Sequence, residues 1–129
     1  MPTAPLNKVC YVEDDEDIQR IVRMSLERLG KMQVEIVGDP TAAIDAILAF
    51  KPDLVLLDWM MPVLDGPTLF RLIRAREELR ELPVVFITAK ASQRELEELR
   101  KMGAAGVLSK PFAPKDLPDQ LRAIWHALP

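Results

Sequence analysis

Five short apolar runs rich in β-branched residues recur along the chain, and helix-length segments separate them. The runs cover residues 6–12, 34–37, 54–57, 84–87 and 105–108. Each run is short enough for a strand that is buried on both faces. Strands and helices that alternate through short turns are joined by right-handed crossovers, which give a parallel sheet with helices on both faces. We therefore expect an α/β protein with a doubly wound, five-stranded parallel sheet and five helices.

The segments between the apolar runs carry signals for the start of helices. The predicted helices cover residues 18–29, 42–50, 67–73, 92–102 and 114–128. Pro67 is typical of the first turn of a helix, and Ser92 with Glu95 matches the capping-box pattern. Because Pro118 would interrupt the middle of the last helix, this helix is expected to begin near Leu117.

Length, composition and charge exclude several classes of protein. The 129 residues are expected to form one domain over residues 1–129, and a hydrophobic fraction of 49% is enough for one core. The formal net charge of −3 lacks the basic excess that binds a phosphate backbone, so nucleic acid is not an expected partner.

Cysteine usage and hydropathy indicate where such a protein works. Cys10 is the only cysteine, so an intrachain disulfide cannot form and a reducing compartment is expected. No apolar stretch reaches the roughly 18 residues of a membrane span, and the first six residues lack the pattern of a secretion signal. We therefore expect a cytoplasmic protein without a membrane partner.

Polar residues that can carry chemistry follow directly after the predicted strands. An acidic run at residues 13–17 follows the first strand, and Asp58, Thr88 and Lys110 follow the third, fourth and fifth. Each has an ordinary structural explanation by itself, such as an acidic run that caps the next helix. In open parallel sheets, however, ligands bind beyond the carboxyl ends of the strands. We therefore expect these side chains to converge at one edge of the sheet.

Three carboxylates at this edge, those of Asp14, Asp15 and Asp58, would repel one another unless a cation joined them. Oxygen ligands favour a hard divalent ion such as Mg²⁺. The three carboxylates are balanced in charge by Lys110 together with a divalent ion. Phosphoryl transfer depends mainly on positioning and charge neutralisation. The pattern therefore predicts that Asp58 accepts a phosphoryl group with the help of Mg²⁺, Lys110 and the hydroxyl group of Thr88.

Four separated motifs, in this order, resemble the receiver domain of two-component response regulators. The motifs are Val12-Glu13-Asp14-Asp15, Leu57-Asp58-Trp59-Met60-Met61-Pro62 with Asp65-Gly66, Ile87-Thr88-Ala89 and Ser109-Lys110-Pro111-Phe112. The resemblance covers essentially the whole chain. It implies a flavodoxin-like fold with strand order 2-1-3-4-5.

The resemblance implies roles in phosphoryl chemistry for three residues. Asp58 would be the phosphoacceptor, and Thr88 and Lys110 would hold the phosphoryl oxygens. A cis peptide bond between Lys110 and Pro111 is also implied. The family's switch includes an aromatic residue three positions before this lysine that rotates inward, but Val107 occupies the position here. We therefore expect the signal to leave the site through displacement of the fourth helix.

The resemblance also implies a set of Mg²⁺ ligands. Besides Asp58, the set contains Asp15 as a direct ligand, Asp14 as an outer ligand through water, and the main-chain carbonyl of Met60. By resemblance, Met60 and Lys90 border the entrance used by attacking water, because they lie two residues beyond Asp58 and Thr88. They are therefore candidates for tuning dephosphorylation.

The expected function is that of a phosphorylation-dependent signalling switch. A histidine kinase or histidine phosphotransfer protein would donate a phosphoryl group to Asp58. The altered surface of the fourth helix, fifth strand and fifth helix would then bind or release an unknown downstream protein. Because no external substrate is turned over, the domain is not expected to be an enzyme. A stand-alone protein and a part of a larger regulator are both compatible with this prediction.

Three alternative functions use the same fold class. A constitutive interaction module that has lost switching is suggested by Val107. An aspartyl-phosphate phosphatase of the haloacid dehalogenase type is less favoured, because that class has Asp-x-Asp and the second position here is Met60. A redox flavodoxin is weaker still, because five acidic residues occupy the place of its phosphate-binding loop and would repel a flavin phosphate.

Overall fold

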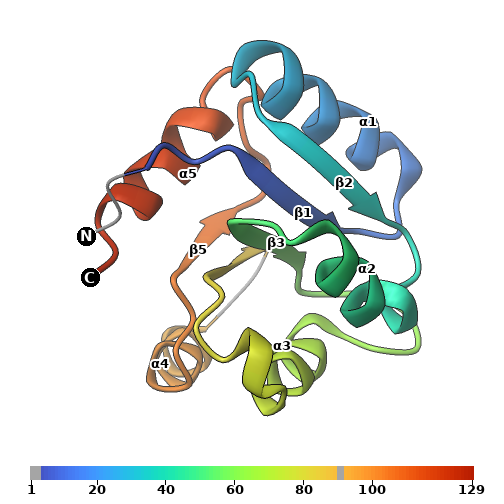
Figure 1. Ribbon diagram of the computed structural model, residues 1–129, viewed down its shortest axis with the longest axis vertical. Helices are drawn as coiled ribbons and strands as arrows, with labels where there is room; N and C mark the ends of the chain where they lie inside the picture. Colours follow the sequence, from blue (N-terminus) through green and yellow to red (C-terminus); the bar gives the residue numbers. More distant parts are fainter. Residues whose placement is uncertain (1–3, 90–91) are drawn as a thin grey trace.

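The computed structural model describes residues 4–89 and 92–129, which contain one sheet of five parallel strands (Figure 1). The strands are β1 (Lys8–Val12), β2 (Gln33–Val37), β3 (Leu54–Asp58), β4 (Val84–Thr88) and β5 (Gly106–Ser109). Their order across the sheet is β2-β1-β3-β4-β5, and each neighbouring pair is parallel. The predicted flavodoxin-like strand order 2-1-3-4-5 is therefore confirmed.

The described part of the chain also forms five α-helices, as predicted. They are α1 (Glu16–Met24), α2 (Ala43–Phe50), α3 (Gly66–Ala75), α4 (Gln93–Lys101) and α5 (Leu117–His126). Ser92 and Glu95 form the expected capping box at the start of α4, and Pro118 lies in the first turn of α5. A single π-helical turn (Ser25–Leu29) extends α1 as far as Gly30. None of the helices in the described residues is both long enough and apolar enough to cross a membrane.

Two elements, β1 and α1, begin two residues away from their predicted starts, and hydrogen bonds explain both differences. β1 begins at Lys8, two residues later than predicted, because the Asp53 carboxylate accepts hydrogen bonds from the main-chain N–H groups of Asn7 and Lys8 at 3.0 and 2.9 Å. α1 begins at Glu16, two residues earlier than predicted, because the side chain of Asp15 caps it. Side-chain hydrogen bonds to the main chain thus set where these elements begin.

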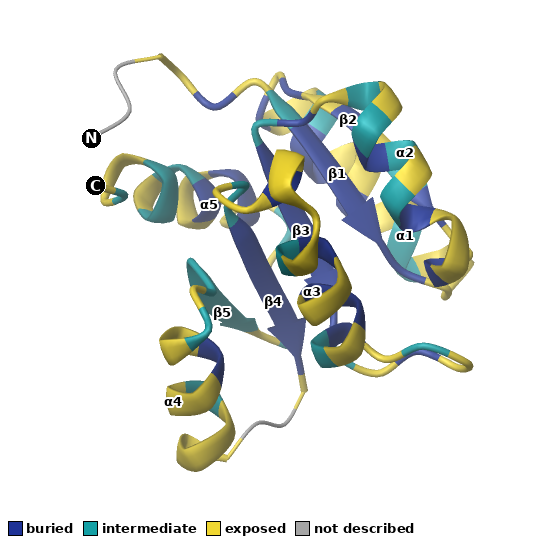
Figure 2. Ribbon diagram, turned by 60° about the horizontal axis from the view of Figure 1, so that its bottom comes forward, coloured by how far each residue is buried: buried dark blue, intermediate teal, exposed yellow. Residues whose placement is uncertain are grey.

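Helices cover both faces of the sheet and divide the core into two halves (Figures 1 and 2). α1 and α5 pack on one face, and α2, α3 and α4 pack on the other. Successive side chains of β1 pack into opposite halves of the core. Val9 and Tyr11 face α1 and α5, whereas Cys10 and Val12 face the other helices. This alternation follows from the two-residue period of a strand, so residues two apart share a face.

The sheet edge formed by β5 and the neighbouring helix α4 are less buried than the centre. The central strands β3 and β4 are buried along their whole length, whereas the residues of β5 are partly or fully exposed. Leu99 is the one buried residue of α4, and Figure 2 shows this helix largely exposed. Few buried contacts therefore hold α4 against the sheet, and such elements need little free energy to move.

Candidate phosphoryl-acceptor site

The residues predicted to handle a phosphoryl group converge at the carboxyl edge of the sheet. Asp58 is the last residue of β3, Thr88 is the last residue of β4, and Lys110 directly follows β5. The main-chain N–H group of Lys110 donates to the Thr88 carbonyl at 2.8 Å, which continues the pairing of β4 and β5 one residue past the end of β5. The topology of the sheet thus brings together three residues that are far apart in the sequence.

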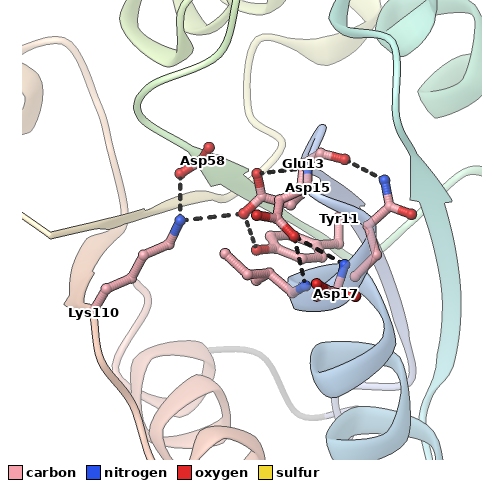
Figure 3. Close-up of polar contacts among 8 residues, drawn as sticks. Tyr11, Glu13, Asp15, Asp17, Asp58 and Lys110 are labelled. Carbon is pink, nitrogen blue, oxygen red and sulfur yellow. Dashed lines mark hydrogen bonds and ion pairs between the residues drawn. The ribbon is translucent and has the colours of Figure 1, made fainter.

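Lys110 joins two buried carboxylates (Figure 3). Its Nζ atom donates to Asp58 Oδ1 at 2.9 Å and to Glu13 Oε1 at 3.2 Å. Asp58 is 4% exposed and Glu13 is 1% exposed, so water screens these ion pairs little. Partial burial lowers the pKa of Lys110, but the hydrogen bond to Asp58 and the negative charge of Glu13 outweigh it, and the pKa is raised overall. The ammonium group is therefore charged at neutral pH.

Glu13 contacts Lys110 at this edge of the sheet, although it was not among the predicted site residues. Burial raises the pKa of its carboxyl group, and the neighbouring Asp58 raises this pKa further, whereas Lys110 and Tyr11 act in the opposite direction. Glu13 Oε1 also accepts a hydrogen bond from Tyr11 Oη at 3.0 Å, and Oε2 lies 3.4 Å from the main-chain nitrogen of Asp15. One sequence signal could have found Glu13: it is the first polar residue after β1 and continues the alternation that Tyr11 belongs to.

Glu13, Asp14 and Asp58 form an acidic cluster in which one carboxylate oxygen from each residue lies within 4.8 Å of the others. From the sequence we expected Asp15 in this cluster instead of Glu13. Asp15 Oδ1 accepts hydrogen bonds from the main-chain N–H groups two and three residues later, at 2.9 and 3.1 Å, and so caps α1. These N–H groups have no partner inside the helix, so the cap stabilises its first turn. The acidic cluster therefore contains Glu13 where Asp15 was expected, and the roles of Asp14 and Asp15 as Mg²⁺ ligands stay predictions.

Gly66 holds the loop after β3 against the main chain of Asp58 and Trp59. Its N–H group donates to the Trp59 carbonyl at 2.8 Å. A Cβ atom at position 66 would lie 2.4 Å from the carbonyl oxygen of Asp58 and 2.9 Å from Cα of Trp59. Side chains are not tolerated at such distances, so this approach requires glycine. The ring of Trp59 packs on Phe86, with 5.4 Å between the ring centroids.

The same loop contains an unusual turn centred on Val63. The backbone φ angle of Val63 is 71°, and the N–H group of Leu64 donates to the Pro62 carbonyl at 2.7 Å. A hydrogen bond between residues two apart with positive φ is typical of a γ-turn, which is strained for a β-branched residue. Val63 is 93% exposed and Met60 is 77% exposed, so this loop presents apolar side chains shortly after Asp58.

Thr88 connects the site to a cavity between α4 and β5. Its side chain is almost completely buried and lines a cavity of about 520 Å³. Val107 lines the same cavity from β5, at the position where an aromatic residue was expected from the resemblance. The space beside Thr88 is therefore lined by a short aliphatic side chain rather than by a ring.

Two further predictions concern the loops of the site. The Lys110–Pro111 peptide bond is cis, as predicted. Lys90, a predicted neighbour of the water entrance, lies outside the described residues, and its role stays a prediction.

A doubly wound sheet of order 2-1-3-4-5, with an acidic cluster and a lysine at its carboxyl edge, is the architecture of signalling receiver domains. The chain belongs to the response regulator receiver domain family, whose family model matches residues 9–122. The recognition made from the sequence motifs is therefore confirmed, and the chain is a receiver domain of the kind found in two-component signalling.

Individual relatives place the chain among CheY-like receivers. Chemotaxis protein CheY-3 of Vibrio cholerae is 35% identical over 121 residues, which cover 94% of this chain and 93% of that protein. The phosphate regulon transcriptional regulatory protein PhoB of Klebsiella pneumoniae is 32% identical over 121 residues, which cover 52% of its length. Among solved structures, chemotaxis protein CheY4 of Vibrio cholerae superimposes with a TM-score of 0.84 at 28% identity and covers 92% of this chain.

Proposed function

We propose that this receiver domain is a phosphorylation-dependent switch in which Asp58 accepts a phosphoryl group from a histidine kinase or a histidine phosphotransfer protein. A carboxylate oxygen of Asp58 attacks the phosphorus atom, the bond between phosphorus and the donor's imidazole nitrogen breaks, and the imidazole leaves. The observation that carries the proposal is the position of Lys110 between two buried carboxylates at the end of β3. The domain turns over no external substrate in this role.

A divalent cation, Mg²⁺ by the chemistry of the donor set, is part of the proposal. The cluster of Glu13, Asp14 and Asp58 offers carboxylate oxygens only, which are ligands that Mg²⁺ prefers. When bound, the ion would neutralise charge as the phosphoryl group approaches. The three carboxylates are balanced by Lys110 together with a divalent ion. The main-chain carbonyl of Met60 stays a predicted ligand of the ion. Besides Asp14 and Asp58, we favour Glu13 over Asp15 as a carboxylate ligand, because Glu13 lies in the cluster.

Intact-mass analysis with a small phosphodonor and Mg²⁺ tests the acceptor. We expect one added phosphoryl group on the wild type and none on Asp58→Asn, because the amide is a poor nucleophile. Asp119→Asn is a matched control, because Asp119 is exposed in the first turn of α5, away from the site. Labelling of Asp58→Asn at the wild-type level would contradict the assignment, and so would an unlabelled wild type.

We further propose that the signal leaves the site through Thr88 and α4. The Thr88 side chain lines the cavity beneath α4, and one buried leucine holds this helix to the sheet. In this proposal the phosphoryl group draws the Thr88 hydroxyl toward Asp58, which makes a contact that exists only in the modified state and so shifts the position of α4. Val107 needs no rotation in this mechanism.

Amide hydrogen exchange with and without beryllofluoride, a phosphoryl mimic, tests this route. We expect exchange in α4 to change in the wild type and in Thr88→Ser, which keeps the hydroxyl group, but not in Thr88→Ala. The same change in Thr88→Ala would refute the role of the hydroxyl group. An α4 that does not respond in the wild type would instead support a constitutive interaction module, the alternative that Val107 favours.

A further inference from the structure

Tyr11 reaches the acceptor site from inside the core. It lies on β1 with no exposed surface and packs in the half of the core covered by α1 and α5. Because residues two apart on a strand share a face, its ring points along the same side as Glu13. Its Oη atom donates to Glu13 Oε1 at 3.0 Å (Figure 3). A phenol in the core thus contacts a carboxylate of the site.

Glu13 Oε1 accepts from two donors, one on β1 and one directly after β5. Tyr11 Oη lies at 3.0 Å and Lys110 Nζ at 3.2 Å from this oxygen. Since Glu13 is 1% exposed, water cannot replace a donor that is lost. The same Lys110 ammonium group also donates to Asp58 Oδ1 at 2.9 Å. Lys110 is therefore shared between Glu13 and Asp58, and Tyr11 is the second donor on the Glu13 side.

We propose that Tyr11 is a positioning residue for phosphoryl uptake, which acts by keeping Glu13 hydrogen-bonded while Lys110 serves Asp58. The inference rests on the proposed function of Asp58. Without the phenol, the buried oxygen Oε1 of Glu13 would depend on Lys110 as its donor. Glu13 would then draw the ammonium group away from Asp58. With the phenol present, Lys110 can turn to the incoming phosphoryl oxygens and leave Glu13 with a partner.

The test compares phosphorylation rates at saturating Mg²⁺ and acetyl phosphate in Tyr11→Phe, Glu13→Gln and the double variant. Phenylalanine keeps the buried ring and removes only the hydroxyl group. We expect Tyr11→Phe to be slower than the wild type by about three- to tenfold, the value of one hydrogen bond. Because Tyr11 acts through Glu13, adding Tyr11→Phe to Glu13→Gln should cause no further decrease.

Two measurements separate positioning from a general loss of stability. Ile73→Val, a change in the buried face of α3, is the control for a weakened core and should keep the wild-type rate. In urea unfolding without Mg²⁺, the effects of Tyr11→Phe and Glu13→Gln on the free energy of unfolding should not be additive, because both variants alter the same hydrogen bond. This second readout does not depend on phosphorylation.

Each other outcome overturns the proposal. A Tyr11→Phe rate within about twofold of the wild type would refute the positioning role, whereas a wild type that takes up no phosphoryl group would refute the proposed function as well. If Tyr11→Phe lowered the phosphorylation rate of Glu13→Gln as much as it lowers the rate of the wild type, Tyr11 would not act through Glu13. An equal decrease of the rate in Ile73→Val would show that a weakened core is the cause. Additive effects of the two variants on the free energy of unfolding would show that the hydrogen bond between Tyr11 and Glu13 is not the physical basis of the effect.

Discussion

Removing the charge of Asp14 is expected to make the protein more stable when no divalent ion is present. Asp14 is the exposed member of the acidic cluster with Glu13 and Asp58, and its nearest oxygen lies within 4.8 Å of an oxygen of each neighbour. Asn has the same shape as Asp and no charge. The variant Asp14→Asn therefore removes electrostatic repulsion with little change in packing.

The magnitude follows from the distances in the cluster. Two unit charges separated by 4.8 Å repel by about 0.9 kcal/mol in bulk water and by about 3.5 kcal/mol at an effective dielectric constant near 20. The lower value applies because Asp14 is exposed. Two carboxylate neighbours act on Asp14, and Lys110 offsets part of their effect, so we expect a net gain in unfolding free energy of about 1 kcal/mol. For a chain of this length the gain corresponds to an increase in Tm of roughly 3 to 5 °C.

Mg²⁺ is expected to reverse the order of stability. A ligand that binds only the folded state at a concentration about tenfold above its Kd stabilises the protein by about 1.4 kcal/mol. The wild type should gain this stabilisation, whereas Asp14→Asn has lost a ligand and should gain much less. The wild type should then become the more stable of the two proteins. About 1 M NaCl, with a Debye length near 3 Å, should abolish most of the difference seen without Mg²⁺.

Thermal unfolding followed by circular dichroism at low salt, with Mg²⁺ or EDTA, measures both effects. Asp116→Asn is the matched control, because Asp116 is exposed at the start of α5 and its side chain makes no capping hydrogen bond. This control should show neither the gain in EDTA nor the loss of the Mg²⁺ response. An Asp14→Asn protein that is less stable than the wild type in EDTA, or equally stabilised by Mg²⁺, would refute the reasoning.

Three further predictions concern strain and burial. Val63→Gly should raise the urea-measured free energy of unfolding by about 0.5 to 1 kcal/mol, because glycine tolerates positive φ, whereas Val63→Ala keeps a Cβ atom and should bring no gain. Gly66→Ala should lower the same quantity by about 2 to 3 kcal/mol, because its Cβ atom would press on the main chain of Asp58, and a variant of wild-type stability would contradict this. Burial, with a smaller effect of a nearby carboxylate, raises the pKa of Cys10 from 9.0 to about 12, so at pH 9 iodoacetamide should label unfolded protein far faster than folded protein. The folded thiol holds its proton in this range, so the free energy of unfolding should also decrease as pH rises from 9 toward 12.

Local sequence patterns were sufficient to predict the sheet and the helices. Apolar runs of strand length, separated by capping and proline signals, describe interactions within a few residues of each other, which a linear pattern contains. The capping box of Ser92 and Glu95 and the start of α5 near Pro118 are examples of such local signals. A local sequence pattern does not show hydrogen bonds from side chains far along the chain. The start of β1 at Lys8 was missed for this reason, because the main-chain N–H group of Lys8 donates to the carboxylate of Asp53, 45 residues away.

The order of elements also determined which strand ends meet, and so the convergence of Asp58, Thr88 and Lys110 was predictable. Strands that alternate with helices must lie parallel, and their carboxyl ends must share one edge of the sheet. Family motifs at the same positions strengthened this prediction. The residue types at the strand ends then indicated a cation and an acceptor carboxylate.

Tertiary structure alone decided which acidic residues face the site. Five consecutive acids at residues 13–17 have no spacing pattern that separates a carboxylate in the site from one that caps a helix. The choice depends on where β1 stops and α1 starts, and a shift of one residue reverses the direction of a side chain. Glu13 turns toward Lys110, 97 residues away, whereas Asp15 turns toward the start of α1. The sequence by itself therefore determined the fold and predicted Asp58 as the acceptor. The packing of β1, β3 and β5 decided that Glu13 contacts Lys110, because that contact forms only when distant segments meet.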